Sequence, residues 1–329
     1  MIFPIRVRVL ALNPRSVLRR SFTMNVPLTV AGTLFALAFV GTLIGLAVDH
    51  TIVTGVPAWI KPAKFMLSSA IYAFTLIWML SFVQGHRRLI AVASWVSAIS
   101  VGTEDLLITL QAARHATSHF NFSTPFDSVV WTTMGLLTIG MWGGCFLVGI
   151  ALLRQRLSNP TLAWALRLGV MLALVGMSLA FFMATPTAAQ LAAAKAGQGL
   201  PYSGQHTIGA AADGGPGIPF LGWSTVAGDM RIAHFVGLHG LQFLPLVAFA
   251  VMRLLPGFRT STRTALVVIA GFAYLGCDLL LAWQALRGQS VIHPDALTLT
   301  VAATVIAATA SAIAVTLLRD RRAVVLHAT

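Results

Sequence analysis

The chain has 329 residues, of which 57% are hydrophobic and only 9% are charged, and its mean hydropathy is +0.84. Soluble domains carry about 25% charged residues, so a chain this apolar needs lipid as its solvent. The formal net charge of +13 does not indicate nucleic-acid binding, because the basic residues cluster in short segments between apolar stretches. The composition therefore excludes a soluble globular protein and predicts an all-α integral membrane protein.

Eight apolar segments are long enough to cross a bilayer, which takes roughly 20 helical residues each. They are residues 26–49, 63–83, 90–113, 128–153, 164–184, 231–252, 264–287 and 295–318. A basic segment, residues 1–25, precedes them. No small-residue cleavage site follows the first apolar run, so we interpret that run as a retained membrane span.

The segments between the spans alternate in charge. Those expected on one side hold 16 of the 22 Lys and Arg residues and a single acid, Asp320. Because positive charge marks the cytoplasmic side, both termini are predicted to be cytoplasmic in a bacterial-type inner membrane. The longest outer segment is then loop 185–230, whose alanine-rich stretch 188–196 favours a short helix. Whether this loop covers a functional site is open.

An internal repeat divides the chain. Residues 105–114 and 278–287 match at an offset of 173, with six of ten positions identical, and residues 60–65 match residues 230–235 more weakly. The identical polar residues are Asp105, Gln111 and Arg114 in the first copy, and Asp278, Gln284 and Arg287 in the second. We therefore predict two four-helix halves, residues 26–158 and 159–329 with loop 185–230 in the second, related as parallel repeats.

Ionisable groups inside the spans are costly and need partners. We expect Lys64 to pair with Asp105, and His234 to pair with Asp278, with Arg231 lying just above the second pair. Such pairs either hold helices together or line a polar cavity, and the sequence leaves both readings open. Gln111 and Arg114 fall about 240° and 180° around a regular helix from Asp105, so they cannot share its face.

Histidine is the second polar signal, because seven of the nine histidines fall on or near the outer side. His115 and His119 are four residues apart and form a candidate metal pair. His234, His239 and His293 are candidate haem ligands. The cofactor expected at this site is therefore haem b or a transition-metal ion.

The arrangement of two parallel four-helix halves resembles that of haem A synthase, and each half is similar to a cytochrome b561. The resemblance covers span number and repeat order and implies a helical bundle with haem, although neither half carries the paired histidines of those families. The H-x3-H and H-x4-H spacings also resemble those of membrane di-iron desaturases. Those enzymes have more histidine boxes, on the cytoplasmic side, so we reject that relation.

Three functions remain open from the sequence. The first is a redox or metal-binding protein with an outer His/Asp site. The second is a transporter or channel for a small solute or ion, although the cytoplasmic half of every span is almost free of polar side chains. The third is a non-catalytic subunit or assembly factor. The lipid bilayer is the expected partner; a second copy of the chain or a membrane complex is a further alternative, and nucleic acid is not expected.

Overall fold

The structure is a computed structural model that describes residues 14–210 and 212–326, with side chains from residue 18 to residue 320. Arg6 and Arg8 of the basic N-terminal segment therefore lie outside the described residues. Eight helices of the described chain are long and apolar enough to cross a membrane, which confirms the predicted multi-pass all-α class. Each predicted span coincides with one of these helices.

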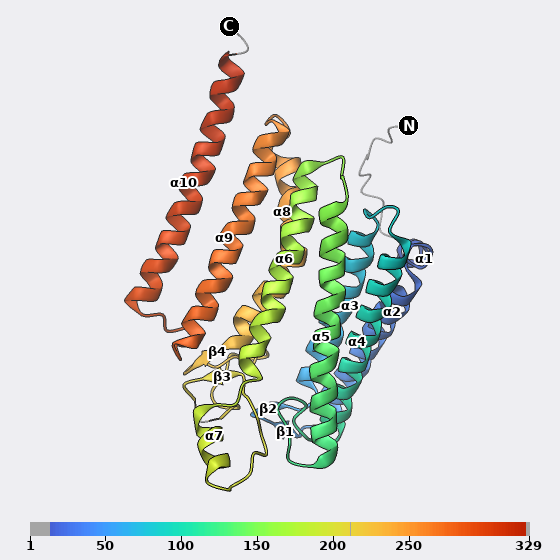
Figure 1. Cartoon of the computed structure of the whole chain (residues 1–329), viewed down its shortest axis with the longest axis vertical. Coiled ribbons are helices and arrows are strands. Elements are labelled where there is room, and N and C mark those ends of the chain that lie inside the picture. The colour runs from blue at the N-terminus through green and yellow to red at the C-terminus, as the bar shows by residue number, and fades with distance from the viewer. Residues whose placement is uncertain (1–13, 211, 327–329) are drawn as a thin grey trace.

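The helices follow one another along the chain, and the longest connection lies between α7 and α8 (Figure 1). Their bounds are α1 Pro14–Met24, α2 Val26–Val48, α3 Ile60–Leu80, α4 Arg87–Ala113, α5 Pro125–Arg154, α6 Pro160–Met183, α7 Ala188–Lys195, α8 Met230–Leu254, α9 Thr260–Leu286 and α10 Ala296–Leu326. The short α7 confirms the helix predicted in the alanine-rich stretch. It has a capping box, in which Thr187 and Gln190 bond each other's backbone N–H groups.

Helices α5 and α6 begin earlier than the hydropathy pattern indicated, because proline is tolerated in the first helical turn, whereas α2 begins at Val26 as predicted. Asn25, Thr124 and Asn159 are N-caps whose side chains accept a backbone hydrogen bond, and a proline follows within the first turn in each case. These caps satisfy N–H groups that would otherwise be unpaired at the helix ends. Cap chemistry, rather than apolar content, therefore sets where these spans start.

Two small antiparallel ladders lie among the connections. Strands β1 (Ile52–Val53) and β2 (Val56–Pro57) pair next to the start of α3. Strands β3 (Thr207–Ile208) and β4 (Gly228–Asp229) close the long segment between α6 and α8, with Thr207 opposite Asp229. This segment, residues 184–229, is called the outer loop, and the end of the bundle that carries it is called the outer end.

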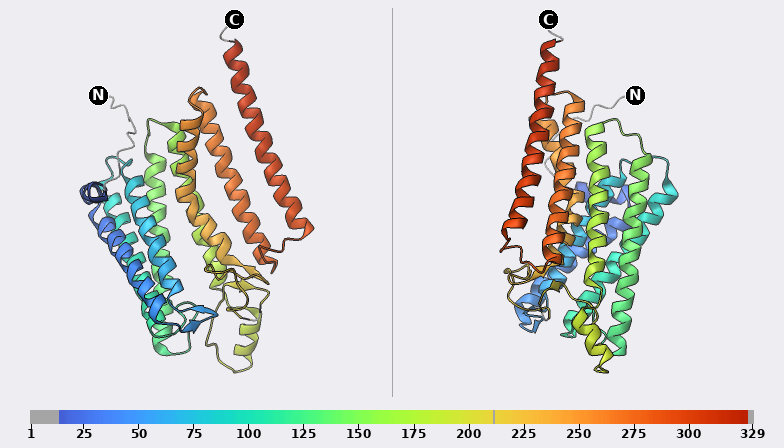
Figure 2. Two further views of the ribbon diagram at one scale, coloured as in Figure 1. Left: turned by 180° about the vertical axis from the view of Figure 1, so that it is seen from behind. Right: turned by 60° about the vertical axis from the view of Figure 1, so that its left-hand side comes forward.

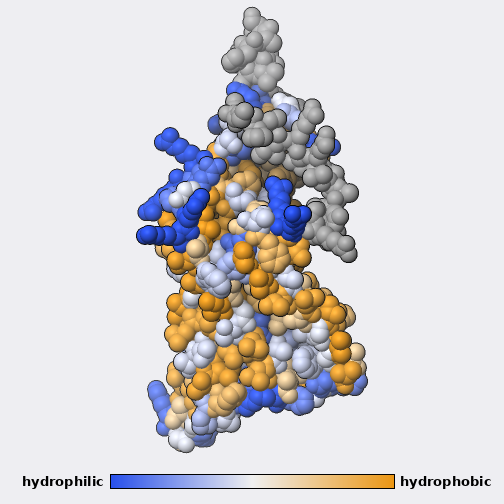
Figure 3. All heavy atoms as spheres, turned by 90° about the vertical axis from the view of Figure 1, so that its right-hand side faces the viewer, coloured by the Kyte–Doolittle hydropathy of each residue, from blue (hydrophilic) through white to orange (hydrophobic). Residues whose placement is uncertain are grey.

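The described ends of the chain both lie at the end of the bundle opposite the outer loop, but at opposite edges of the bundle (Figure 1). From the side, apolar residues form a broad belt with hydrophilic residues beyond it (Figure 3). The helices are arranged as a row, with α2 near one edge and α10 beside α9 at the other (Figure 2). Such a belt fits a bilayer, and the threading agrees with an even number of spans.

The tightest helix contact joins α6 and α8 through glycines. A Cβ atom placed on Gly237 would lie 2.5 Å from the Cα of Gly176, and one placed on Gly169 would lie 3.1 Å from the carbonyl oxygen of Gly240. Small residues let two backbones approach closely, which is a common way for helices to associate in membranes. This contact fixes the position of the outer end of α8, where several polar groups lie.

The two stretches matched in sequence end their helices in the same way. His115 donates its N–H to Ala112 O at 3.0 Å, and Gly288 donates to Ala285 O at 2.9 Å. Both residues have positive φ, +55° and +71°, as in a Schellman C-cap. The repeat is therefore present in local structure at the ends of α4 and α9, while the division of the whole chain into two duplicated halves remains a prediction.

Candidate functional site

Three histidines lie near one another at the outer end, although they come from different parts of the chain. His119 is in the connection between α4 and α5, His206 is in the outer loop, and His234 is near the start of α8. The ring centroids of His119 and His206 are 6.4 Å apart. His234 is linked to them through aromatic rings: its ring centroid is 5.0 Å from that of Phe235, which lies 6.5 Å from Phe65, and Phe65 lies 6.3 Å from His119. These imidazoles form the centre of the candidate site.

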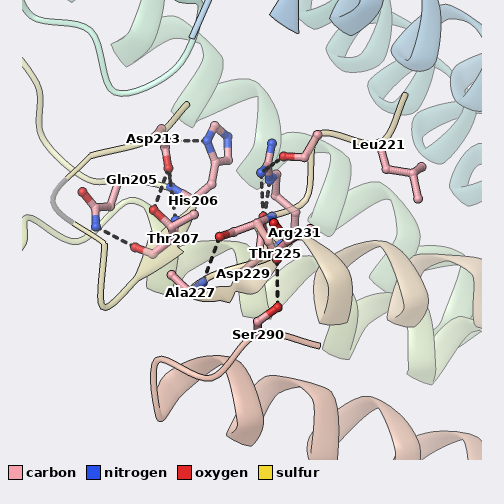
Figure 4. Close-up of polar contacts among 12 residues, drawn as sticks. Gln205, His206, Thr207, Asp213, Leu221, Thr225, Ala227, Asp229, Arg231 and Ser290 are labelled. Carbon is pink, nitrogen blue, oxygen red and sulfur yellow. Dashed lines mark hydrogen bonds and ion pairs between the residues drawn. The ribbon is translucent and has the colours of Figure 1, made fainter. Parts of the chain in front are cut away.

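His206 is fixed by Asp213, seven residues further along the outer loop (Figure 4). Its Nδ1 atom is 2.6 Å from Asp213 Oδ2, and its backbone N–H donates to the same carboxylate at 3.0 Å. Because a carboxylate only accepts, the proton sits on Nδ1 of His206. The Nε2 atom is therefore the nitrogen left free.

His234 is held in an equivalent way by the backbone. Its Nδ1 atom donates to the carbonyl oxygen of Gly176 on α6 at 2.7 Å. A carbonyl oxygen can only accept, so Nε2 is again the nitrogen without a proton when the ring is neutral. The close approach of α6 to α8 thus also sets the tautomer of His234.

His119 has a hydroxyl on one side and a carboxylate on the other. Its Nδ1 atom lies 3.2 Å from Ser118 Oγ, and its Nε2 atom lies 3.8 Å from Glu104 Oε1. Glu104 Oε2 is buried and has no hydrogen-bond partner among the described residues. His119 and Glu104 are mostly buried, with 18% and 13% of their side chains exposed.

Burial keeps these loop histidines neutral. It lowers the pKa of His119 well below its usual range, and the nearby Lys61 lowers it further. Burial also lowers the pKa of His206, despite the opposing effect of Asp213. For Asp213 itself, burial raises the pKa, but the hydrogen bonds that it accepts from the ring and the backbone of His206 outweigh this effect, so the net pKa lies below its usual range. Neutral imidazoles are the form that binds metal ions.

Aromatic rings surround the histidines. Trp131 lies 5.3 Å from His119, and Phe120 lies 4.9 Å from His206, measured between ring centroids. Phe65 on α3 and Phe235 on α8, which occupy matched positions of the weaker sequence repeat, contact each other at 6.5 Å. The polar centre is therefore enclosed by apolar rings, which limits its contact with water.

The outer loop covers this site. Its backbone pairs with the first half through Phe122 N–H, which donates to Pro201 O at 2.8 Å, and through Lys64 Nζ, which donates to Leu221 O at 2.9 Å. It is bound to the second half by Arg231, which donates to Gly222 O and also pairs with Asp229. The loop thus forms a cap across the outer end. The sequence had left open whether the loop covers the site.

The two predicted ion pairs are not formed. Lys64 bonds Leu221 O and His234 bonds Gly176 O, as described above, so neither contacts an aspartate. Asp105 and Asp278 are instead buried, at 1% and 0% exposure. Their carboxylate oxygens have no hydrogen-bond partner among the described residues. Both aspartates are therefore buried within their helices as expected, but the partners predicted from the sequence are wrong.

The remaining repeated polar residues close the ends of their helices. Gln111 Nε2 donates to Thr117 O at 3.2 Å, and Gln284 Nε2 donates to Ser290 O at 2.8 Å, at matched positions. Arg114 pairs with Asp127 at 2.8 Å, and Arg287 pairs with Asp295. The wheel argument that separated Gln111 and Arg114 from Asp105 agrees with these partners. We interpret both sets as structural.

The other predicted ligands are not brought together. His115 lies beyond the end of α4, is half exposed, and contacts Asp49 Oδ2 at 3.0 Å rather than sharing a partner with His119. His239 and His293 are exposed, on α8 and in the last connection, and the structure shows no contact of either with His234. Within the described chain, no three His, Cys, Asp or Glu side chains stand close enough to hold a metal ion as they are placed.

Sequence reasoning missed Asp213 and Ser118 as partners of the site histidines. The only available signal was a histidine and an aspartate seven residues apart in a glycine-rich segment. That spacing becomes meaningful only when the loop folds back on itself, as it does between His206 and Asp213.

The chain is thus, by its fold, a multi-pass α-helical membrane protein. Comparison with known proteins adds no family to this class: no family model matches the chain, no curated protein matches it, and no solved structure matches it.

Proposed function

We propose that the protein holds a transition-metal ion at its outer face, between His119 and His206, with His234 as a third imidazole. The observation that carries this proposal is the pair of His119 and His206 rings, whose centroids are 6.4 Å apart and whose planes differ by 28°. Two imidazoles on opposite sides of one ion, with bonds of about 2.0–2.1 Å, have ring centroids roughly 6 Å apart.

The hydrogen bonds around the histidines support this proposal. Metal-binding histidines commonly donate their second ring nitrogen to a carboxylate or a backbone carbonyl, which orients the ring. His206 donates to Asp213, and His234 donates to Gly176 O. Glu104, 3.8 Å from His119 Nε2, places a carboxyl group beside the proposed position of the ion.

The proposal favours an ion over haem. A bis-histidine haem needs two ligands on opposite faces of a flat ring, and the predicted set of His234, His239 and His293 is not gathered in one place. Imidazole ligands suit copper, iron, nickel and zinc. Copper or iron would give the protein a redox role, whereas zinc would not, so identifying the ion tests that part of the proposal.

The test is metal analysis of protein purified in detergent, with an absorption spectrum and titration of the stripped protein with copper, zinc, nickel and iron. We expect about one ion per chain, and at least tenfold weaker binding in His119→Ala and His206→Ala. His293→Ala, which alters an exposed histidine, is the matched control and should bind normally. A Soret band, or binding that does not change in the two site variants, would refute the ion site.

A further inference from the structure

Two buried carboxylates remain unexplained by the proposed metal site. Asp105 and Asp278 are 1% and 0% exposed, and all four of their carboxylate oxygens lack a hydrogen-bond partner among the described residues. Most buried polar groups in proteins are paired, and an unpaired ionised carboxylate in an apolar interior is very costly. Each aspartate therefore needs something that the protein itself does not supply.

The neighbours of Asp105 offer no positive charge. Ser69 on α3 approaches its carboxylate without the geometry of a full hydrogen bond. The adjacent Glu104 is another acid. Lys64, which lies closer than Ser69 to the outer end of α3, donates to Leu221 O instead. Positive charge that could have balanced Asp105 is thus directed to the outer loop.

Asp278 lies in an equivalent setting on the other half. A Cβ atom placed on Gly237 of α8 would be 2.9 Å from its Oδ2 atom, so the carboxylate packs against helix backbone. The backbone of Gly237 approaches it without hydrogen-bond geometry. On its own helix, Cys277 is a neutral thiol, and the Tyr274 hydroxyl donates to Val236 O instead. His234, three residues before Gly237, is bonded to Gly176 O.

The two sites match in position as well as in chemistry. Each aspartate lies eight residues before the last residue of its helix, α4 or α9, which is about 12 Å from the helix end. Each faces the helix that begins at the matched position, α3 or α8. An ionisable residue within a span is a sign of function unless a partner neutralises it, and here the same unpaired group occurs in both halves.

We propose that Asp105 and Asp278 each bind one monovalent cation, a proton or Na⁺, so that the protein carries one cation site in each half. A proton would sit on one carboxylate oxygen, and Na⁺ would lie between the carboxylate and nearby backbone or hydroxyl oxygens. Either cation removes the cost of the isolated negative charge. The proposal is independent of the metal site, because it involves none of the three histidines.

The experiment uses the purified full chain in nanodiscs and begins with the unaltered protein. Infrared difference spectra in H₂O and D₂O detect the C=O stretch of a carboxylic acid, which shifts on deuteration. Thermal unfolding at fixed ionic strength, with Na⁺ exchanged for choline, detects Na⁺ binding. The same measurements are made on Asp105→Asn, on Asp278→Asn and on the double variant. The control is Asp49→Asn, because the Asp49 carboxylate lies at the outer end and already accepts several hydrogen bonds.

If the cation is a proton, the unaltered protein shows the carboxylic-acid band, each single Asn variant loses part of its intensity, and the double variant loses more than either. If the cation is Na⁺, the unaltered protein melts at a higher temperature in Na⁺ than in choline, and the Asn variants lose this difference. The control variant should behave as the unaltered protein does. Absence of both signals in the unaltered protein, or a band that persists undiminished in the double variant, would overturn the proposal.

Discussion

At the scale of single residues, the outer site depends on which nitrogen of each histidine is free. The pattern of charge along the sequence was enough to predict that most histidines lie on one side of the membrane. Their tautomers could not be predicted, because they depend on contacts to Asp213 and to the carbonyl of Gly176, which are distant in sequence or belong to the backbone. The same limit explains the failed ion pairs: Lys64 bonds a carbonyl oxygen 157 residues away.

Asp213 acts on the proposed ion through His206, so it is a positioning residue. We expect Asp213→Asn to weaken binding by about 10–100-fold, as loss of an outer partner of a metal-binding histidine commonly does. The measurement is competition with a chromophoric chelator. Asp295→Asn, a change in a different outer ion pair, should leave the affinity unchanged. Equal effects of the two variants would show that general destabilisation, rather than ring orientation, is responsible.

Asp295 gives a prediction for the dependence of stability on pH. Its hydrogen bond with Arg287, and bonds with Thr298, hold its pKa below the usual range. The carboxylate therefore stabilises the fold fully at pH values above its pKa in the unfolded chain, which is about 3.9. This contribution is lost as the pH falls below that value towards the pKa in the folded protein.

The matched variant for this effect is Asp295→Asn, which retains a polar cap for α10 but has no charge to titrate. We expect the unaltered protein to lose more thermal stability than this variant between about pH 5 and pH 3. Melting curves in detergent at constant ionic strength provide the measurement. A parallel loss in both proteins would mean that the Arg287–Asp295 pair does not contribute to acid sensitivity.

At the scale of helices, length and apolar content predicted all eight spans, because a bilayer imposes the same requirement on each of them. Their contacts were not predictable, since helix association within lipid depends on small residues at specific positions rather than on hydrophobicity. Gly176 and Gly237 illustrate this point, because they are ordinary glycines in the sequence and yet lie where two helix backbones come closest.

A methyl group at this contact should separate α6 from α8. We expect Gly237→Ala to reduce the free energy of unfolding by about 1–3 kcal/mol, because the new Cβ would meet the backbone of Gly176. It should also weaken metal binding, since the bond that orients His234 crosses the same contact. Gly143→Ala on α5 is the control, because no atom lies within 4 Å of its added Cβ. Thermal unfolding and metal affinity of both variants test the prediction.

At the scale of the whole molecule, the alternation of charge along the sequence corresponds to the two ends of the bundle. Arg87 and Arg88 begin α4, and Arg154 ends α5, at the end opposite the outer loop. These groups therefore lie at one end of the bundle, and the side of the membrane that this end faces is assigned from its charge. The positive-inside rule makes that assignment, and the outer location of both proposed sites depends on it.

Cysteine labelling in intact cells tests this orientation. Of the native cysteines, Cys145 is buried and Cys277 is exposed on α9, so both are first replaced by alanine. We expect a membrane-impermeant maleimide to label Gln198→Cys, in the outer loop, without permeabilisation, and to label Gln84→Cys, between α3 and α4, only after it. Both positions are exposed, so access to the compartment, rather than burial, decides the result. The reverse pattern would place His119, His206 and His234 on the cytoplasmic side, and the proposed ion would then have to come from the cytoplasmic metal pool.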